Sequence, residues 1–127
     1  MKNFPAVAAV LTLLVLVGGI FLFSGNKEVS PEPAPATPTA HEYFWGDGCP
    51  HCEVVEEFFS TWENRDKVAI DKKEVWSSAA NAKILQQRAE YCGIRPSEVG
   101  VPFLFTPNGK CLSGDEPIID FFKNLPL

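Results

Sequence analysis

The sequence predicts an α/β sandwich with a mixed four-stranded sheet, in the order βαβαββα, preceded by a single transmembrane helix. Three observations lead to this fold class. Short runs rich in aromatic or β-branched residues alternate with segments whose apolar residues recur at helical spacing. The chain has 127 residues, enough for one small domain with one core. An uncharged stretch of membrane-spanning length precedes the first predicted strand.

Residues 4–23 form an uncharged run that matches the length needed to cross the hydrocarbon core of a membrane. We interpret residues 1–23 as an amino-terminal, single-pass anchor in the lipid bilayer. Lys2 places the short tail on the cytoplasmic side, so the rest of the chain is expected on the extracytoplasmic side, in a periplasm or at the cell surface. A cleaved signal peptide is the alternative, although the run is longer than a typical signal core and no Ala-x-Ala pattern follows it closely.

Residues 24–40 carry four prolines among small and polar residues and have too few apolar side chains to fold. Proline-rich segments favour extended conformations, so this segment is predicted to be a tether. The remaining residues, 41–127, are predicted to form one folded domain.

Charge and cysteine content narrow the class of function. The chain has 11 basic residues against 16 acidic residues and a net charge of −5, which argues against nucleic acid as a partner. Four cysteines downstream of a predicted membrane segment fit an oxidising compartment, in which disulfides persist.

The first half of the domain predicts a strand, a helix and a second strand. Residues 41–45 are rich in aromatics and predict the first strand. Residues 68–76 alternate loosely in polarity and predict the second strand, in which residues 71–74 form a solvated edge. Between the strands, apolar residues recur at helical spacing from residue 50 onward and predict a core-facing stripe. The members of the stripe are Val54, Val55, Phe58, Phe59 and Trp62.

The second half predicts a helix, a hairpin and a final helix. Ser77 or Ser78 caps a helix that ends at Gly93, with Leu85, Ala89 and Cys92 on one face. Residues 102–105 and 110–112 predict two strands joined by a turn at residues 107–109. Residues 115–125 predict the closing helix. Its inward-facing residues are Ile118, Ile119, Phe121 and Phe122.

The stretch FWGDGCPHC, residues 44–52, places two cysteines three positions apart at a helix start. At that spacing the side chains lie on one side of the first turn with α-carbons roughly 5–6 Å apart, within the range of a disulfide. Pro50 suits the first helical position, so Cys49 falls at the N-cap, where the helix dipole and free N–H groups stabilise a thiolate. The pattern predicts a reversible thiol–disulfide site at Cys49 and Cys52. A fixed structural disulfide and half of a zinc site are the alternatives.

His51 lies between the two cysteines in the sequence. A partly protonated imidazole there favours the Cys49 thiolate and hence the reduced form, which makes the disulfide more oxidising. Asp47 and the glutamates at positions 53, 56 and 57 disfavour a thiolate, although acids in a first helical turn are also ordinary partners of the helix dipole.

Cys92 and Cys111 are predicted to form a structural disulfide that ties the second helix to the hairpin. Closing a loop of about 20 residues contributes ~3 kcal/mol in the loop-entropy model. A second, electron-relaying pair is the alternative. A zinc site built from all four cysteines has poor spacing, because these two do not form a close pair in the sequence. We predict no metal and no organic cofactor.

Phe44 and Trp45 before the Cys-Pro-His-Cys segment, and Gly100-Val101-Pro102 before the third strand, resemble the thioredoxin fold family in its minimal form, over residues 41–127. The resemblance implies that Pro102 is cis and lies against the active-site disulfide. It also implies that the backbone of Val101 pairs with an extended substrate, and that Trp45 contributes to the substrate-binding surface.

The Cys-Pro-His-Cys tetrapeptide itself is similar to that of DsbA-like periplasmic disulfide oxidases, although this chain is too short to hold their large helical insertion. Thioredoxins that reduce substrates carry a buried carboxylate six residues before the first cysteine, and Tyr43 stands at that position here. A tyrosine, with an ordinary pKa of about 10, is a poor replacement. This departure favours oxidation or isomerisation over reduction.

The sequence therefore predicts a membrane-anchored thiol–disulfide oxidoreductase that acts on protein thiols in the extracytoplasmic space. Cys49 is expected to exchange with the substrate, Cys52 to resolve the mixed disulfide, and a membrane redox partner to reset the pair. One alternative is a thioredoxin-like reductant fed by a membrane donor. The other is a non-enzymatic module, either a metal carrier that uses Cys49, Cys52 and His51 or a disulfide-stapled interaction domain.

Overall fold

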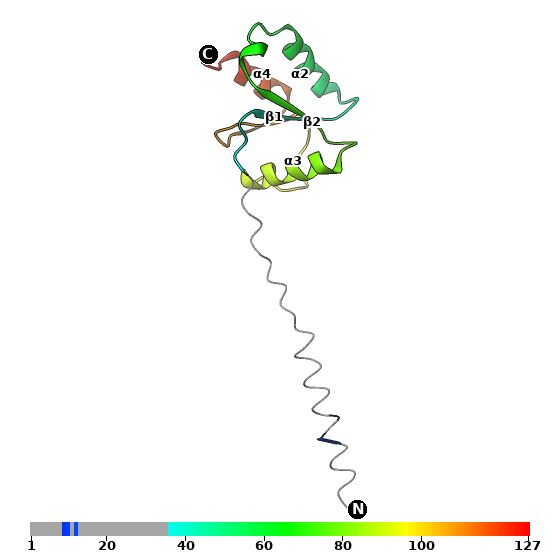
Figure 1. Ribbon diagram of the computed structural model, residues 1–127. Coiled ribbons are helices and arrows are strands. Elements are labelled where there is room, and N and C mark those ends of the chain that lie inside the picture. The colour runs from blue at the N-terminus through cyan, green and yellow to red at the C-terminus, as the bar shows by residue number, and fades with distance from the viewer. Residues whose placement is uncertain (1–8, 11, 13–35) are drawn as a thin grey trace, which may run out of the picture. The chain divides into compact units, whose positions relative to one another are not determined.

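A computed structural model of the protein describes residues 9, 10, 12 and 36–127 (Figure 1). Residues 9, 10 and 12 have helical backbone. The rest of the predicted membrane span, residues 4–23, and residues 24–35 of the predicted tether lie outside the described residues. Within the described part, no helix is both long enough and apolar enough to cross a membrane.

The described domain is a mixed α/β fold, and its elements follow the predicted order βαβαββα. A single turn of 3₁₀ helix, Arg65–Lys67, is inserted before the second strand. The elements are β1 (His41–Trp45), α2 (Pro50–Thr61), β2 (Ile70–Glu74), α3 (Ala79–Tyr91), β3 (Phe103–Phe105), β4 (Cys111–Ser113) and α4 (Asp115–Lys123).

The four strands form one mixed sheet in the order β2-β1-β3-β4. Strands β1 and β2 are parallel, with Tyr43 opposite Lys72, whereas β1 pairs with β3 and β3 with β4 in antiparallel fashion. The parallel pair needs a crossover, which α2 supplies, whereas a tight turn is enough to join β3 to β4. The mixed four-stranded sheet is confirmed, and β1 is an interior strand between β2 and β3.

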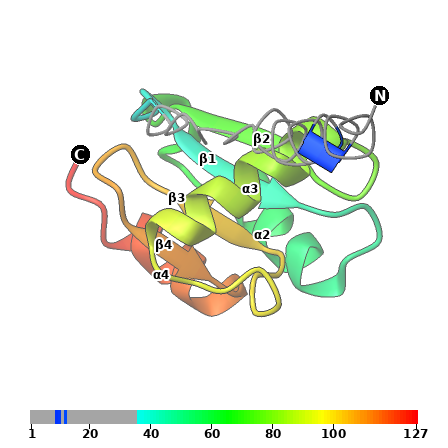
Figure 2. The same cartoon turned by 90° about the horizontal axis from the view of Figure 1, so that it is seen from below.

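Helices cover both faces of the sheet: α2 and α4 lie on one face and α3 lies on the other (Figure 1). The view from below shows α3 running across the sheet (Figure 2). Because side chains alternate along a strand, Tyr43 and Leu104 point to the α2 and α4 face, whereas Phe44, Phe103 and Phe105 point to the α3 face. Both faces of β1 and β3 are therefore buried.

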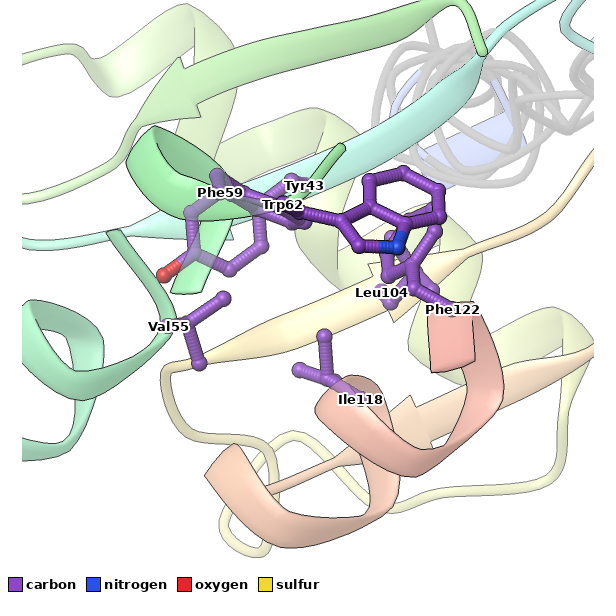
Figure 3. Close-up of a cluster of buried hydrophobic side chains, with 7 residues drawn as sticks. All are labelled: Tyr43, Val55, Phe59, Trp62, Leu104, Ile118 and Phe122. Atoms are coloured by element: carbon purple, nitrogen blue, oxygen red, sulfur yellow. The ribbon is translucent and has the colours of Figure 1, made fainter. Parts of the chain in front are cut away.

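The larger core cluster lies between the sheet and helices α2 and α4 (Figure 3). Phe59 of α2 makes edge-to-face contacts with Tyr43, at 5.3 Å between ring centroids, and with Phe122 of α4, at 5.1 Å. Burying a side chain of this size stabilises the fold by roughly 1.5–3 kcal/mol. The members of the cluster are Tyr43, Val55, Phe59, Trp62, Leu104, Ile118 and Phe122.

The predicted apolar stripe of α2 is only partly correct. Val55, Phe59 and Trp62 are buried, but Val54 is 46% exposed. Val54 and Val55 are neighbours on the helix, so only one of them can face the sheet. The buried stripe instead continues toward the amino terminus through Cys52, which is 1% exposed.

The second predicted strand and the last predicted helix are shorter than expected. Strand β2 runs only from Ile70 to Glu74, so Val68 and Trp76 lie outside it. Helix α4 ends at Lys123 instead of residue 125. The predicted boundaries were set by the pattern of apolar residues. That pattern does not show where the last backbone hydrogen bonds of an element form, so the ends differ by a few residues.

The prediction for α3 is confirmed in detail. Ser78 is the N-cap, and its side chain accepts a hydrogen bond from the backbone N–H of Asn81. Leu85 and Ala89 are buried on the face that packs against the sheet, and the half-buried Cys92 joins the same cluster. The helix ends just before Gly93, as the sequence indicates.

A buried ion pair on the α3 face was not predicted. Nε of Arg88 lies 2.7 Å from Oε2 of Glu42 in β1, and both residues are 6% exposed. The guanidinium also stacks over the ring of Phe105 at 4.7 Å and donates to the carbonyl oxygen of Ala36 at 3.0 Å. The end of the predicted tether is therefore in contact with the domain.

Candidate active site

The predicted thiol–disulfide pair lies where β1 passes into α2. The connecting loop turns through Gly48, which has φ of +75°, a conformation that favours glycine. Cys49 is the N-cap of α2 and Pro50 occupies the first turn. Sγ of Cys49 accepts a hydrogen bond from the backbone N–H of Cys52 at 3.3 Å. The first cysteine thus sits at the positive end of the helix dipole, as predicted.

Cys49 and Cys52 are joined in a disulfide, with their α-carbons 5.2 Å apart. This distance lies inside the predicted range, because both residues belong to the first turn of one helix. Cys49 is 5% exposed and Cys52 is 1% exposed. The first cysteine is therefore the more accessible of the two, whereas the second faces the core.

The segment before β3 completes the site from a distant part of the chain. The Val101–Pro102 peptide bond is cis, as the resemblance implies. Sγ of Cys49 lies 3.8 Å from the carbonyl oxygen of Val101. Val101 is not part of the register that pairs β3 with β1 and β4. Its backbone therefore borders the disulfide without being committed to the sheet.

The third predicted substrate-binding residue, Trp45, has a different environment. Its side chain is half-buried and packs against the core cluster on the α2 and α4 face. Its carbonyl oxygen accepts a hydrogen bond from the N–H of Val75 at 2.9 Å. Trp45 thus supports the loop that leads to Cys49, and a direct role in substrate binding stays a prediction.

His51 has a partner that the sequence did not predict. Its Nδ1 lies 3.2 Å from Oδ2 of Asp115, the first residue of α4, and its side chain is 72% exposed. The hydrogen bond from His51 lowers the pKa of Asp115 below its ordinary value, so the carboxylate is ionised at neutral pH. Because this carboxylate faces the imidazole, any positive charge on His51 acts less on Cys49 than the isolated tetrapeptide suggests.

Tyr43 lies beneath the disulfide and is fully buried. Its hydroxyl donates to the carbonyl oxygen of Cys52 at 3.4 Å. Burial, together with the charge of Glu56, raises the pKa of Tyr43 further above its ordinary value. The hydroxyl is therefore protonated at neutral pH and cannot accept a proton from Cys52.

Glu56, one helical turn after Cys52, is more than a solvated helix residue. It forms an ion pair with Lys72 of β2 at 2.5 Å, and its side chain is 35% exposed. Its second carboxylate oxygen, Oε1, is buried and has no hydrogen-bond partner among the described residues. The carboxylate is thus held against the side of the site that carries Cys52 and Tyr43.

Cys92 and Cys111 form the second disulfide, with α-carbons 6.4 Å apart. It ties the end of α3 to the start of β4, on the face of the sheet opposite α2. The four cysteines are therefore divided into two separate pairs. Within residues 36–127, no group of three or more His, Cys, Asp and Glu side chains is arranged to hold a metal ion.

Comparison of the chain with family models, curated proteins and solved structures finds no match.

Proposed function

We propose that this protein is a thiol–disulfide oxidoreductase with a thioredoxin-like domain, and that Cys49 and Cys52 are its redox-active pair. The observation that carries the proposal is the disulfide at the amino terminus of α2, in which Sγ of Cys49 accepts the N–H of Cys52. A hydrogen bond and a helix dipole directed at one sulfur stabilise its thiolate. A purely structural disulfide has no need of this arrangement.

The reaction follows from the difference between the two sulfurs. A substrate thiolate attacks Sγ of Cys49, the Cys49–Cys52 bond breaks, and Cys52 leaves with the electron pair and takes up a proton. A second substrate thiolate then attacks the substrate sulfur of the mixed disulfide and releases Cys49 as the thiolate. The substrate loses two electrons and gains a disulfide, and the enzyme becomes a dithiol. A membrane redox partner that accepts two electrons closes the cycle.

We infer that oxidation or isomerisation is the favoured direction. Stabilising the Cys49 thiolate stabilises the reduced enzyme and so makes the disulfide a stronger oxidant. Tyr43 supports the same direction, because its protonated hydroxyl cannot assist Cys52 in attacking a mixed disulfide. In this proposal residues 4–23 anchor the domain on the extracytoplasmic side of a membrane, and Pro102 with Val101 receives the substrate chain beside Cys49.

The test uses the full-length protein in detergent and a reduced, unfolded substrate protein that needs disulfides for its activity. We expect the oxidised protein to transfer its disulfide to the substrate, and Cys49→Ser to abolish the transfer. The matched control is a Cys92→Ala/Cys111→Ala variant, which should retain it. Activity that depends on the second pair and not on Cys49 would refute the assignment. If the oxidised protein transferred no disulfide, but the reduced protein efficiently reduced a substrate disulfide, the protein would be a reductant.

A further inference from the structure

An aromatic side chain that the proposed reaction does not use lies exposed beside the active-site loop, residues 46–49, which joins β1 to α2. Trp76, in the connection between β2 and α3, is 61% exposed. Its six-membered ring packs against the backbone of Gly46, and a Cβ atom added at Gly46 would lie only 2.4 Å from two ring carbons. The indole is therefore in close contact with the active-site loop, yet most of its surface is open to solvent.

Glu74 fixes this position by joining the two loops. Its carboxylate accepts hydrogen bonds from the backbone N–H groups of Trp76 at 2.9 Å, Ser77 at 2.8 Å and Asp47 at 3.4 Å. The hydroxyl of Ser77 donates to the same group, and together these bonds lower the pKa of Glu74 to about 2. The carboxylate is ionised at neutral pH, and the indole is held in place before any partner arrives.

The indole contacts the loop that leads to the reacting sulfur, three residues before Cys49. The carbonyl oxygen of Gly46, against which the ring packs, accepts the backbone N–H of Cys49 at 3.1 Å. Val75, next to Trp76, and Val101, next to the disulfide, pack against the same core cluster on the α3 face. A polypeptide whose cysteine has reached Cys49 therefore has a neighbouring residue within reach of the indole.

The charges around the indole select the kind of residue that it binds. Glu74 is ionised beside the ring, and Asp47 is exposed on the adjoining loop. The nearest basic residue in the sequence, Lys73, is paired with Asp71 at 2.7 Å. A cationic side chain over an indole face is attracted by the ring quadrupole, and nearby carboxylates add to that attraction.

We propose that Trp76 is a specificity-determining platform that binds a lysine or arginine next to the reacting cysteine of an extended substrate polypeptide. This inference rests on the proposed function, because that function supplies the polypeptide at Cys49. It adds a preference that the disulfide chemistry does not require: substrates with a basic residue beside the cysteine react faster than those with a neutral or acidic one.

The test measures the rate at which short peptides with one cysteine reduce the full-length oxidised protein in detergent. The residue beside the cysteine is arginine, leucine, serine or glutamate, and dithiothreitol serves as a reductant without side chains. We expect the arginine peptide to react about two- to fivefold faster than the serine peptide, the range of an exposed cation–π contact, and the difference to shrink in high salt.

Two variants remove the platform in different ways. Trp76→Ala deletes the indole, whereas Gly46→Ala keeps the indole but forces the ring away, and the backbone of Gly46 has no positive φ that would itself require glycine. Both should bring the arginine-to-serine ratio close to one, and the dithiothreitol rate of each variant, measured in parallel, shows whether the disulfide itself still exchanges. Tyr91→Ala, which removes an aromatic side chain that is 64% exposed far along α3, is the matched control and should keep the ratio.

The outcomes separate this inference from the proposed function. An unchanged ratio in Trp76→Ala, or a leucine peptide faster than the arginine peptide in the parent protein, overturns the platform while leaving the oxidoreductase intact. A protein whose Cys49–Cys52 disulfide exchanges with neither dithiothreitol nor any peptide overturns the proposed function, and the platform with it.

Discussion

Removing the second disulfide tests the division of roles between the two cysteine pairs. The Cys92→Ala/Cys111→Ala variant opens a covalent link that joins the end of α3 to the start of β4, across a sequence separation of 19 residues. The loop-entropy model gives ~3 kcal/mol for a closed loop of that length. In a domain of this size each kcal/mol shifts the melting temperature by roughly 4–8 °C, so we expect a loss of roughly 12–24 °C.

The assay combines thermal unfolding by circular dichroism with the transfer of a disulfide to a reduced substrate. The variant should melt at a much lower temperature than the parent and yet transfer disulfides at a similar rate well below its melting temperature. The reason is that Cys49 and Cys52 belong to the start of α2, and α2 and α3 cover opposite faces of the sheet. Cys49→Ser is the converse control: it should lose the transfer and retain most of the stability. A variant that melts like the parent but no longer transfers disulfides would show that the second pair relays electrons, and the structural role would be wrong.

Three further predictions follow from the site. Alkylation of the reduced protein near pH 6 should label Cys49 well before Cys52, because only the first sulfur lies at the helix terminus; equal labelling would contradict this. His51→Gly should lower the reduction potential, because it removes a group whose positive charge stabilises the Cys49 thiolate. Asp115→Asn should raise the potential, because the variant has no carboxylate to neutralise that charge; three equal potentials in a glutathione buffer would count against any tuning by this pair. Because burial raises the pKa of Tyr43 in the folded state, its contribution to stability is complete below pH 10 and is lost as the pH rises further; Tyr43→Phe should weaken the alkaline loss of stability in urea unfolding, and an identical pH profile would exclude the effect.

Local signals in the sequence were sufficient for the parts of the fold that depend on neighbouring residues. The Cys-Pro-His-Cys segment places Cys49 at an N-cap because proline suits the first helical turn, and the structure confirms this with an α-carbon distance of 5.2 Å between the cysteines. Ser77 or Ser78 was predicted as the cap of α3 on the same local grounds, and the structure shows that Ser78 is the N-cap. The predicted membrane anchor rests on the composition of residues 4–23 and stays a prediction.

The sequence did not indicate which residue of an element would be buried where two neighbouring apolar residues fit the same periodic pattern. Val54 and Val55 both fit an apolar stripe, and only the position of the sheet decided that Val55 is buried and Val54 exposed. Trp76 fits a strand by composition, yet it lies beyond the end of β2 with its ring on Gly46. Apolar residue type alone does not distinguish a core position from a surface position, so burial depends on the packing of the whole domain.

By itself the sequence determined the order of the elements, the helix that Cys49 caps and the residue types of the redox pair, because these depend on residues that are near one another in the chain. Residue spacing did not indicate what surrounds that pair: the resemblance implied Val101 and Pro102, and only the tertiary structure showed Asp115 beside His51. Val101 lies 52 residues from Cys49 in the sequence, and Asp115 lies 64 residues from His51. Such contacts form when the chain folds back through β3 and α4, and their geometry depends on strand order and helix packing, for which local spacing carries no signal.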